Sequence, residues 1–211
     1  MKKTIFLILL FTISMNLSSQ DLAPISLNKP NLSQGSSLME AFQNRRSQRE
    51  FSDKQLSIAE ISDLLWAAYG INKDDGKRTA PTATNAQEID VYLINADGAY
   101  FYDAANFVLQ PVYKGDLRQS IAAGQDFVLA APISILIVAD ISKLRGNDND
   151  RKIRLACMDG GIVSQNIALF CAGRNLATVP RATMDDKSLR EALKLKDTQY
   201  TILNHPVGYK K

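Results

Sequence analysis

The chain has 211 residues, of which 45% are hydrophobic and 22% are charged, as expected for a globular domain of ordinary size. The formal net charge is only +3 at pH 7 and no long basic run occurs, which argues against nucleic-acid binding. Two cysteines and one histidine do not supply the usual ligand set of a Cys/His zinc site, so no metal site is expected.

Residues 1–20 have the pattern of a secretory signal peptide. Lys2 and Lys3 form a positive start, residues 5–13 are apolar apart from Thr12, and small residues suited to cleavage follow near Ser19. The segment is short for a transmembrane span. We therefore expect an exported, periplasmic or secreted protein with no membrane span after cleavage and one domain over residues 36–211. An uncleaved membrane anchor is the alternative.

Two helices are predicted to begin with the same capping pattern. After an irregular arm over residues 21–35, Ser37 precedes Glu40 by three positions, and Ser57 precedes Glu60 in the same way, which is the spacing of a capping box. Apolar side chains follow each box at helical spacing, and Gly70 is a plausible end for the second helix.

A short basic run lies between these two helices. Arg45, Arg46, Ser47 and Arg49 place three guanidinium groups and one hydroxyl within five residues. The planar guanidinium group of arginine can donate two hydrogen bonds to a pair of phosphate oxygens, and the serine hydroxyl adds a small donor. The run is therefore a candidate anion site. The alternative is a solvated helix end whose arginines pair with surface acids.

Residues 79–87 consist mainly of small and amide side chains and show no hydrophobic period. Small side chains let the backbone approach a flat ligand closely. Asn85 and Gln87 each offer a donor and an acceptor to the polar edge of a heterocycle. This segment is a candidate ligand-binding loop, and an ordinary polar loop before a strand is the alternative.

The strands predicted from alternation and β-branched content are residues 89–95, 99–102 after a turn at Asp97-Gly98, 132–139 and 198–203. Short helices are predicted at residues 116–123, 126–131 and from Ser188 onward. His205 lies in a compact tail and reads as a packing or surface residue, with a catalytic base as the alternative. This order predicts an α+β fold with helices packed on a central, mostly antiparallel sheet.

The longest apolar stretch is residues 155–172, which holds no Lys or Arg and a single acid, Asp159. A helix that is apolar nearly all round is a buried helix, so we expect a long buried central helix here. Gly160 and Gly161 interrupt it, and residues 164–166 place three polar side chains within it. One interpretation is that the glycines let another helix approach and the polar side chains satisfy a neighbouring backbone. The other is that a flat ligand or a partner subunit lies against this helix.

Cys157 and Cys171 are about 21 Å apart along such a helix, too far for a disulfide within one chain. Both are expected to be buried thiols.

Four segments, in this order, resemble the nitroreductase family of flavoproteins. Residues 45–49 are similar to its phosphate motif and residues 80–87 to its Pro-Ser-Ser-x-Asn-x-Gln segment. Residues 164–169 are similar to the Gln-Asn region of its central helix and residues 206–209 to its late Pro-x-Gly-Tyr. The resemblance covers residues 38–209. Residues 64–70 and 100–103 further resemble the branch of azoline dehydrogenases that modify streptolysin-type peptides.

The resemblance implies FMN held noncovalently at the interface of a homodimer, with the central helix at that interface. The implied cofactor-binding residues are Arg45, Ser47 and Arg49 at the phosphate, Arg46 near the ribityl chain or ring edge, Thr82, Ala83 and Asn85 at the flavin of the partner subunit, Gln165 on the central helix, and Ala182 and Thr183 near flavin N5.

The implied activity is an FMN-dependent oxidoreductase that transfers hydride or electrons through flavin N5 to a small organic acceptor, with NAD(P)H as a candidate reductant. No side-chain acid or base is obligatory in such chemistry, so no catalytic residue is assigned. Two features depart from the resemblance. Ala182-Thr183 stands where many members have Glu-Gly, and export would separate the protein from nicotinamide cofactors. An azoline-peptide dehydrogenase and a non-catalytic flavin-binding or interaction protein are the alternatives.

Overall fold

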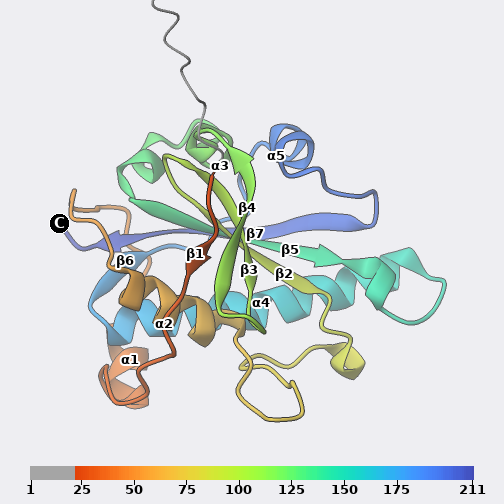
Figure 1. Ribbon diagram of the computed structural model, residues 1–211, viewed down its shortest axis with the longest axis horizontal. Helices are drawn as coiled ribbons and strands as arrows, with labels where there is room; N and C mark the ends of the chain where they lie inside the picture. The colour runs from red at the N-terminus through yellow and green to blue at the C-terminus, as the bar shows by residue number, and fades with distance from the viewer. Residues whose placement is uncertain (1–21) are drawn as a thin grey trace, which may run out of the picture.

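A computed structural model describes residues 22–211, so the predicted signal peptide lies outside the described residues (Figure 1). The strands are β1 (Ile25–Ser26), β2 (Ile89–Ile94), β3 (Gly98–Asp103), β4 (Val108–Lys114), β5 (Ile133–Asp140), β6 (Leu176–Thr178) and β7 (Gln199–Tyr209). The α-helices are α1 (Leu38–Asn44), α2 (Ile58–Tyr69), α3 (Arg118–Ala122), α4 (Asn149–Gly173) and α5 (Asp186–Leu193). The 3₁₀ helices are η1 (Ala83–Asn85), η2 (Asp126–Ala130) and η3 (Ile141–Lys143).

The strands form one sheet in the order β1-β4-β3-β2-β5-β7-β6, and every neighbouring pair is antiparallel. The predicted α+β fold is therefore confirmed. The central strand β5 is buried at every position, because its alternate side chains enter two different cores. Ile135 and Ile137 join one core cluster, and Leu136 and Val138 join the other.

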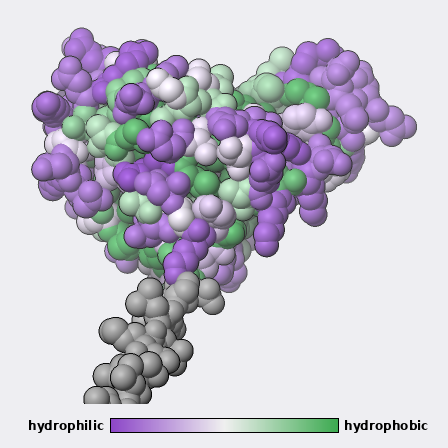
Figure 2. All heavy atoms as spheres, turned by 90° about the horizontal axis from the view of Figure 1, so that it is seen from above, coloured by the Kyte–Doolittle hydropathy of each residue, from purple (hydrophilic) through white to green (hydrophobic). Residues whose placement is uncertain are grey.

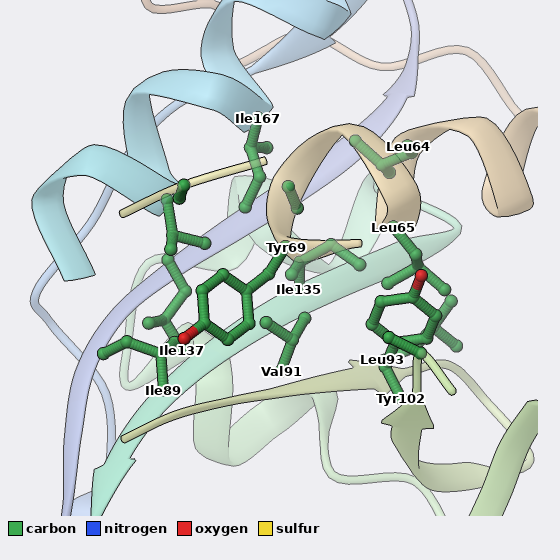
Figure 3. Packing of buried hydrophobic residues seen from close by; sticks show 14 of the residues in the cluster. Leu64, Leu65, Tyr69, Ile89, Val91, Leu93, Tyr102, Ile135, Ile137 and Ile167 are labelled. Atoms are coloured by element: carbon green, nitrogen blue, oxygen red, sulfur yellow. The ribbon is translucent and has the colours of Figure 1, made fainter. Parts of the chain in front are cut away.

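Helices cover both faces of the sheet. Figure 1 shows α1, α2 and α4 below it and α3 and α5 above it. Figure 3 shows the lower core, where Leu65 and Tyr69 of α2 point toward the side chains of the strands and Ile167 of α4 lies on the same side of the sheet. Leu64 and Leu65 are completely buried, which is worth about 2–3 kcal/mol for each side chain. The capping boxes predicted at Ser37 and Ser57 are both formed.

The α3 and α5 side of the molecule is mostly hydrophilic, as the view in Figure 2 shows. The large apolar side chains that remain exposed within residues 22–211 lie mainly on the opposite helical layer and on the arm before it. These are Leu32, Leu38, Met39, Phe42, Ile58, Met158 and Ile162, with Val112 and Tyr113 on β4.

Helix α4 is long, as predicted, but its burial is one-sided. Its side toward the sheet includes the buried Val163, Ile167 and Cys171, whereas Met158 is 65% exposed. Both cysteines are free, as expected from their separation. The prediction that both thiols are buried is wrong for Cys157, which is exposed because it lies on the outer side of α4.

The two adjacent glycines of α4 face different surroundings. A Cβ atom on Gly160 would lie 2.8 Å from Cγ2 of Ile202 on β7, so this glycine lets α4 approach the sheet rather than another helix. A Cβ atom on Gly161 would meet no atom within 4 Å.

We expect Gly160→Ala to destabilise the protein by about 1–2 kcal/mol, because the added methyl group overpacks the core. Gly161→Ala should stabilise it by up to about 1 kcal/mol, because alanine favours the helix and would meet no atom of its own chain within 4 Å. Urea unfolding of the two variants checks this pair. Equal effects of the two substitutions would contradict the different packing of the two glycines.

Several elements differ from the sequence predictions. β4 and β6 were not predicted, and neither was β1, which lies in the predicted irregular arm. Helix α5 begins at Asp186 rather than at Ser188, and the tail after residue 203 continues β7 to Tyr209. Proline explains two of these differences, because proline in a run argues against a strand. Pro111 lies in β4 beside a register shift, and Pro206 lies in β7 opposite Ser134.

Candidate functional site

The arginine run forms an exposed loop along the edge of the sheet. Arg45 caps the end of α1 with extended backbone, and the chain then follows β6 and the end of β7. The Gln48 N–H donates to the Thr178 carbonyl at 2.9 Å, and the Ser52 N–H donates to the Tyr209 carbonyl at 2.9 Å. These backbone bonds hold the loop while leaving its charged side chains in solvent.

All four predicted residues of this loop, Arg45, Arg46, Ser47 and Arg49, are exposed. Within residues 22–211 none of the three guanidinium groups takes part in a salt bridge or a side-chain hydrogen bond. The alternative that these arginines pair with surface acids is therefore not what the structure shows. Three uncompensated cations on five consecutive residues suit a dianionic group such as a phosphate ester.

The connector after β6, residues 181–183, is held in place by the buried side chain of Arg181. The Arg181 guanidinium donates to Asn204 Oδ1 at 2.7 Å, to Gln125 Oε1 at 3.0 Å and to two backbone carbonyls of α3. Burial lowers the pKa of this guanidinium, which is held by neutral acceptors. Asn204 Nδ2 also donates to the Thr183 carbonyl at 3.0 Å. As a result, the predicted site residues Ala182 and Thr183 are exposed on a firmly anchored segment.

Phe127 of η2 joins the arginine loop to this connector. The Arg49 guanidinium carbon lies 5.9 Å from the centre of its ring, and that of Arg181 lies 5.7 Å from the same centre. Within one protomer, Phe127 therefore connects Arg49 of the predicted phosphate residues with Arg181, which directly precedes the predicted N5-proximal residues Ala182 and Thr183. Sequence reasoning missed Phe127, which lies in a short helix with no distinguishing motif.

The predicted loop residues Thr82, Ala83 and Asn85 lie elsewhere, at and before η1. The Ala83 N–H donates to Asp159 Oδ2 at 2.7 Å, which places η1 beside the first half of α4. The arginine loop lies beside β6, beyond the C-terminal end of α4, about 21 Å further along this helix. Figure 1 shows α1 and the segment before β2 near opposite ends of α4. One protomer thus does not bring these two groups of predicted residues together.

The polar side chains within α4 have different surroundings. Gln165, a predicted cofactor-binding residue, is exposed on the outer side of the helix, and Asn166 donates to the Ala68 carbonyl at 3.4 Å. Ser164 is buried and its hydroxyl lies 2.7 Å from His205 Nε2, while the Thr178 hydroxyl lies 3.2 Å from His205 Nδ1.

His205 is completely buried, which lowers its pKa to about 3. The imidazole is therefore neutral over the physiological pH range, with both nitrogens beside hydroxyl groups. This confirms the packing interpretation. The alternative role as a catalytic base is not supported, because the ring has no access to a ligand in solvent.

Comparisons with known proteins identify the family of the chain. The model of the Nitroreductase family matches residues 42–209, which is most of the chain. The chain belongs to the nitroreductase family. A protein of Methanocaldococcus jannaschii that is named as a nitroreductase is 31% identical over 175 residues, covering 79% of this chain and 87% of that protein.

Solved structures place this nitroreductase-family chain among proteins of the same fold. A crystal structure described as a nitroreductase from Ralstonia eutropha has a TM-score of 0.82 and 32% identity, covering 89% of this chain and 90% of that one. A chain of the Escherichia coli microcin synthetase McbBCD complex with truncated pro-MccB17 has a TM-score of 0.68 and 20% identity, covering 99% of this chain and 85% of that one. At that identity the second likeness concerns the fold alone.

Proposed function

We propose that this member of the nitroreductase family is an FMN-dependent oxidoreductase that acts on a small organic acceptor. The observation that carries the proposal is the exposed, uncompensated arginine loop that Phe127 joins to the connector of residues 181–183. Arg45, Ser47 and Arg49 would hold the phosphate of FMN. When bound, FMN supplies the redox chemistry by taking up and releasing a hydride equivalent.

The protein's own contribution is to hold the flavin ring in position. Arg181 and Asn204 hold the backbone of Ala182 and Thr183 in place, so that its peptide groups could orient a flat ring without a flexible side chain. His205, which follows Asn204 in β7, stays neutral and adds no charge to the site. Neither Ala182 nor Thr183 carries an acidic or basic side chain, so these two residues would contribute position rather than proton transfer.

We also propose that the active form is a homodimer. Thr82, Ala83 and Asn85 are separated from the arginine loop by most of the length of α4, so a site containing both needs two copies of the chain. The exposed apolar side chains on α1 and α4 give these copies a surface to share. The signal-like residues 1–20 further favour an exported protein, for which NAD(P)H would not be the physiological donor.

The proposal is tested by the visible absorption spectrum of the purified protein under anaerobic conditions, with and without NADH and NADPH. We expect a bound-flavin spectrum that dithionite bleaches fully. Bleaching by a nicotinamide as well would identify the donor class, whereas bleaching by dithionite alone would favour an extracytoplasmic donor. Absence of flavin even after reconstitution with FMN would overturn the proposed cofactor.

Dehydrogenation of a peptide azoline is a second candidate function, supported by the fold shared with the microcin synthetase chain. Residues 64–70 and 100–103 suggested this branch in the sequence. Several of them, including Leu64, Leu65, Tyr100 and Tyr102, are buried in the core, where they pack rather than face a ligand. Turnover of an azoline-containing peptide by the flavin-loaded protein would favour this function. A non-catalytic role would instead be favoured if no donor and acceptor pair cycles the bound flavin.

A further inference from the structure

Two acidic side chains are buried beneath the 82–85 segment. Glu88 directly precedes β2 and is completely buried, and Asp159 reaches in from α4 and is 7% exposed. Acidic side chains are almost never buried unless a partner holds them. Asp159 is also the single acid in the apolar run of α4. The sequence shows this exception but does not indicate what the side chain binds.

Asp159 holds the backbone of the 82–85 segment. Its Oδ2 atom accepts the Ala83 N–H at 2.7 Å, which joins two parts of the chain that are 76 residues apart. The segment requires such an anchor, because Thr84 and Asn85 have φ angles of 54° and 53°. Residues other than glycine adopt this left-handed conformation only at an energetic cost, so the surrounding contacts must fix it. Thr82 adds a second anchor by accepting the Gln87 N–H at 2.9 Å.

Glu88 lies beside this anchor, next to the Asp159 carboxyl. Neither carboxyl oxygen of Glu88 makes a hydrogen bond with another described residue. Burial, and secondarily the neighbouring Asp159 carboxyl, raise the pKa of Glu88 from its usual 4.5 to about 7. Below this pH a protonated Glu88 can share its proton with Asp159, and a single negative charge then remains to accept the Ala83 N–H.

The other charged and titratable groups around this pair do not neutralise Glu88. They donate to other acceptors or carry no positive charge. Lys143 of η3 lowers the Glu88 pKa, but its ammonium group donates to Asp90 Oδ1 at 3.2 Å and to the Gln87 carbonyl at 3.3 Å. Arg78 donates to the Tyr69 carbonyl and to the Gln87 side chain. Figure 3 shows the Tyr69 hydroxyl pointing toward Ile89 at the start of β2, and this hydroxyl also lacks a described partner.

We propose that Asp159 is the positioning residue of the 82–85 segment and that Glu88 sets the pH range over which Asp159 holds this segment for the cofactor. The inference rests on the proposed function, because it concerns the segment that would contact the flavin of the partner subunit. Ionisation of Glu88 places a second negative charge beside Asp159 in a buried site, and the repulsion displaces the Asp159 carboxylate from the Ala83 N–H. The segment is therefore held below about pH 7 and released as the pH rises through this value.

The direct test is the exchange protection of the Ala83 amide, followed by nuclear magnetic resonance on the purified protein without cofactor at pH 6 and pH 8. We expect the protection factor, corrected for intrinsic exchange, to fall several-fold from pH 6 to pH 8. Glu88→Gln should keep it high at both pH values, because the glutamine amide donates to Asp159 at any pH. Asp159→Asn should lower it about tenfold at pH 6, because a neutral acceptor replaces a charged one.

The second readout is the FMN dissociation constant, measured by fluorescence quenching over the same pH values. The FMN phosphate itself ionises at about pH 6, so the comparison is made with Glu88→Gln. The affinity of the parent protein relative to that of this variant should fall several-fold between pH 6 and pH 8. Asp97→Asn removes an exposed acid at the other end of β2 and is the matched control, with the pH profile of the parent.

Unchanged Ala83 protection in Asp159→Asn, or an identical pH profile in Glu88→Gln, would overturn the inference. Altered protection with unaltered FMN affinity would overturn the link between the segment and the cofactor. Failure of the parent protein to bind FMN at either pH would instead overturn the proposed function, while the protection measurements would still decide whether Asp159 positions the segment.

Discussion

Replacement of both Arg45 and Arg49 by alanine is expected to weaken FMN binding by about 10²- to 10⁴-fold without unfolding the protein. Each charge-assisted contact with a phosphate contributes about 1.5–3 kcal/mol, and two such contacts account for this range. The fold should persist, because both side chains are exposed and the loop is held by backbone bonds from Gln48 and Ser52. Fluorescence quenching gives the affinity, and circular dichroism checks the fold.

Arg145→Ala is the matched control, since it removes an exposed arginine that lies outside the arginine loop, between η3 and α4. Its affinity for FMN should equal that of the parent. Arg49→Lys separates charge from shape, because lysine keeps the positive charge but cannot bind phosphate oxygens in pairs. An unchanged flavin content in the double alanine variant would show that the phosphate of FMN binds elsewhere.

The sequence supported the fold because several local signals agreed with one another. Two capping boxes fixed the starts of α1 and α2, and the run of β-branched residues in β5 identified the strand buried on both faces. The missed elements are those whose pairing comes from tertiary structure. β6 is a three-residue edge strand, and its partner β7 continues through Pro206, a residue that local rules exclude from a central strand.

The candidate site was less accessible to sequence reasoning. The arginine loop was visible because its residues are consecutive, and it proved exposed and free of ion pairs. Phe127, Asn204 and the Glu88–Asp159 pair were missed, because each acts through a contact between distant segments. Asp159 illustrates the limit: an acid in an apolar helix signals a partner, but only the folded chain shows that the partner is the Ala83 N–H.

The second large effect is expected from Ile162→Glu, which should dissociate the proposed homodimer and abolish FMN retention together. Ile162 is 38% exposed on the outer side of α4, where Met158 is 65% exposed. The same helical layer carries a groove of about 440 Å³, lined in part by Leu38, Trp66 and Phe170, which a second copy could fill. A carboxylate buried in such an apolar interface would lose its hydration without gaining a partner. Light scattering after size-exclusion chromatography measures the mass, and the flavin spectrum measures retention.

Val112→Glu provides the control, because Val112 is 36% exposed and lies on β4 rather than on this helical layer. It should leave both mass and flavin content unchanged.

The mass and the flavin content of Ile162→Glu are informative in combination. A monomeric Ile162→Glu variant that keeps FMN would mean that one chain completes the site, so that Thr82, Ala83 and Asn85 do not contact the cofactor. A dimeric variant that loses FMN would mean that α4 borders the cofactor without forming the interface, and the separation of the two groups of site residues along α4 would then need another explanation.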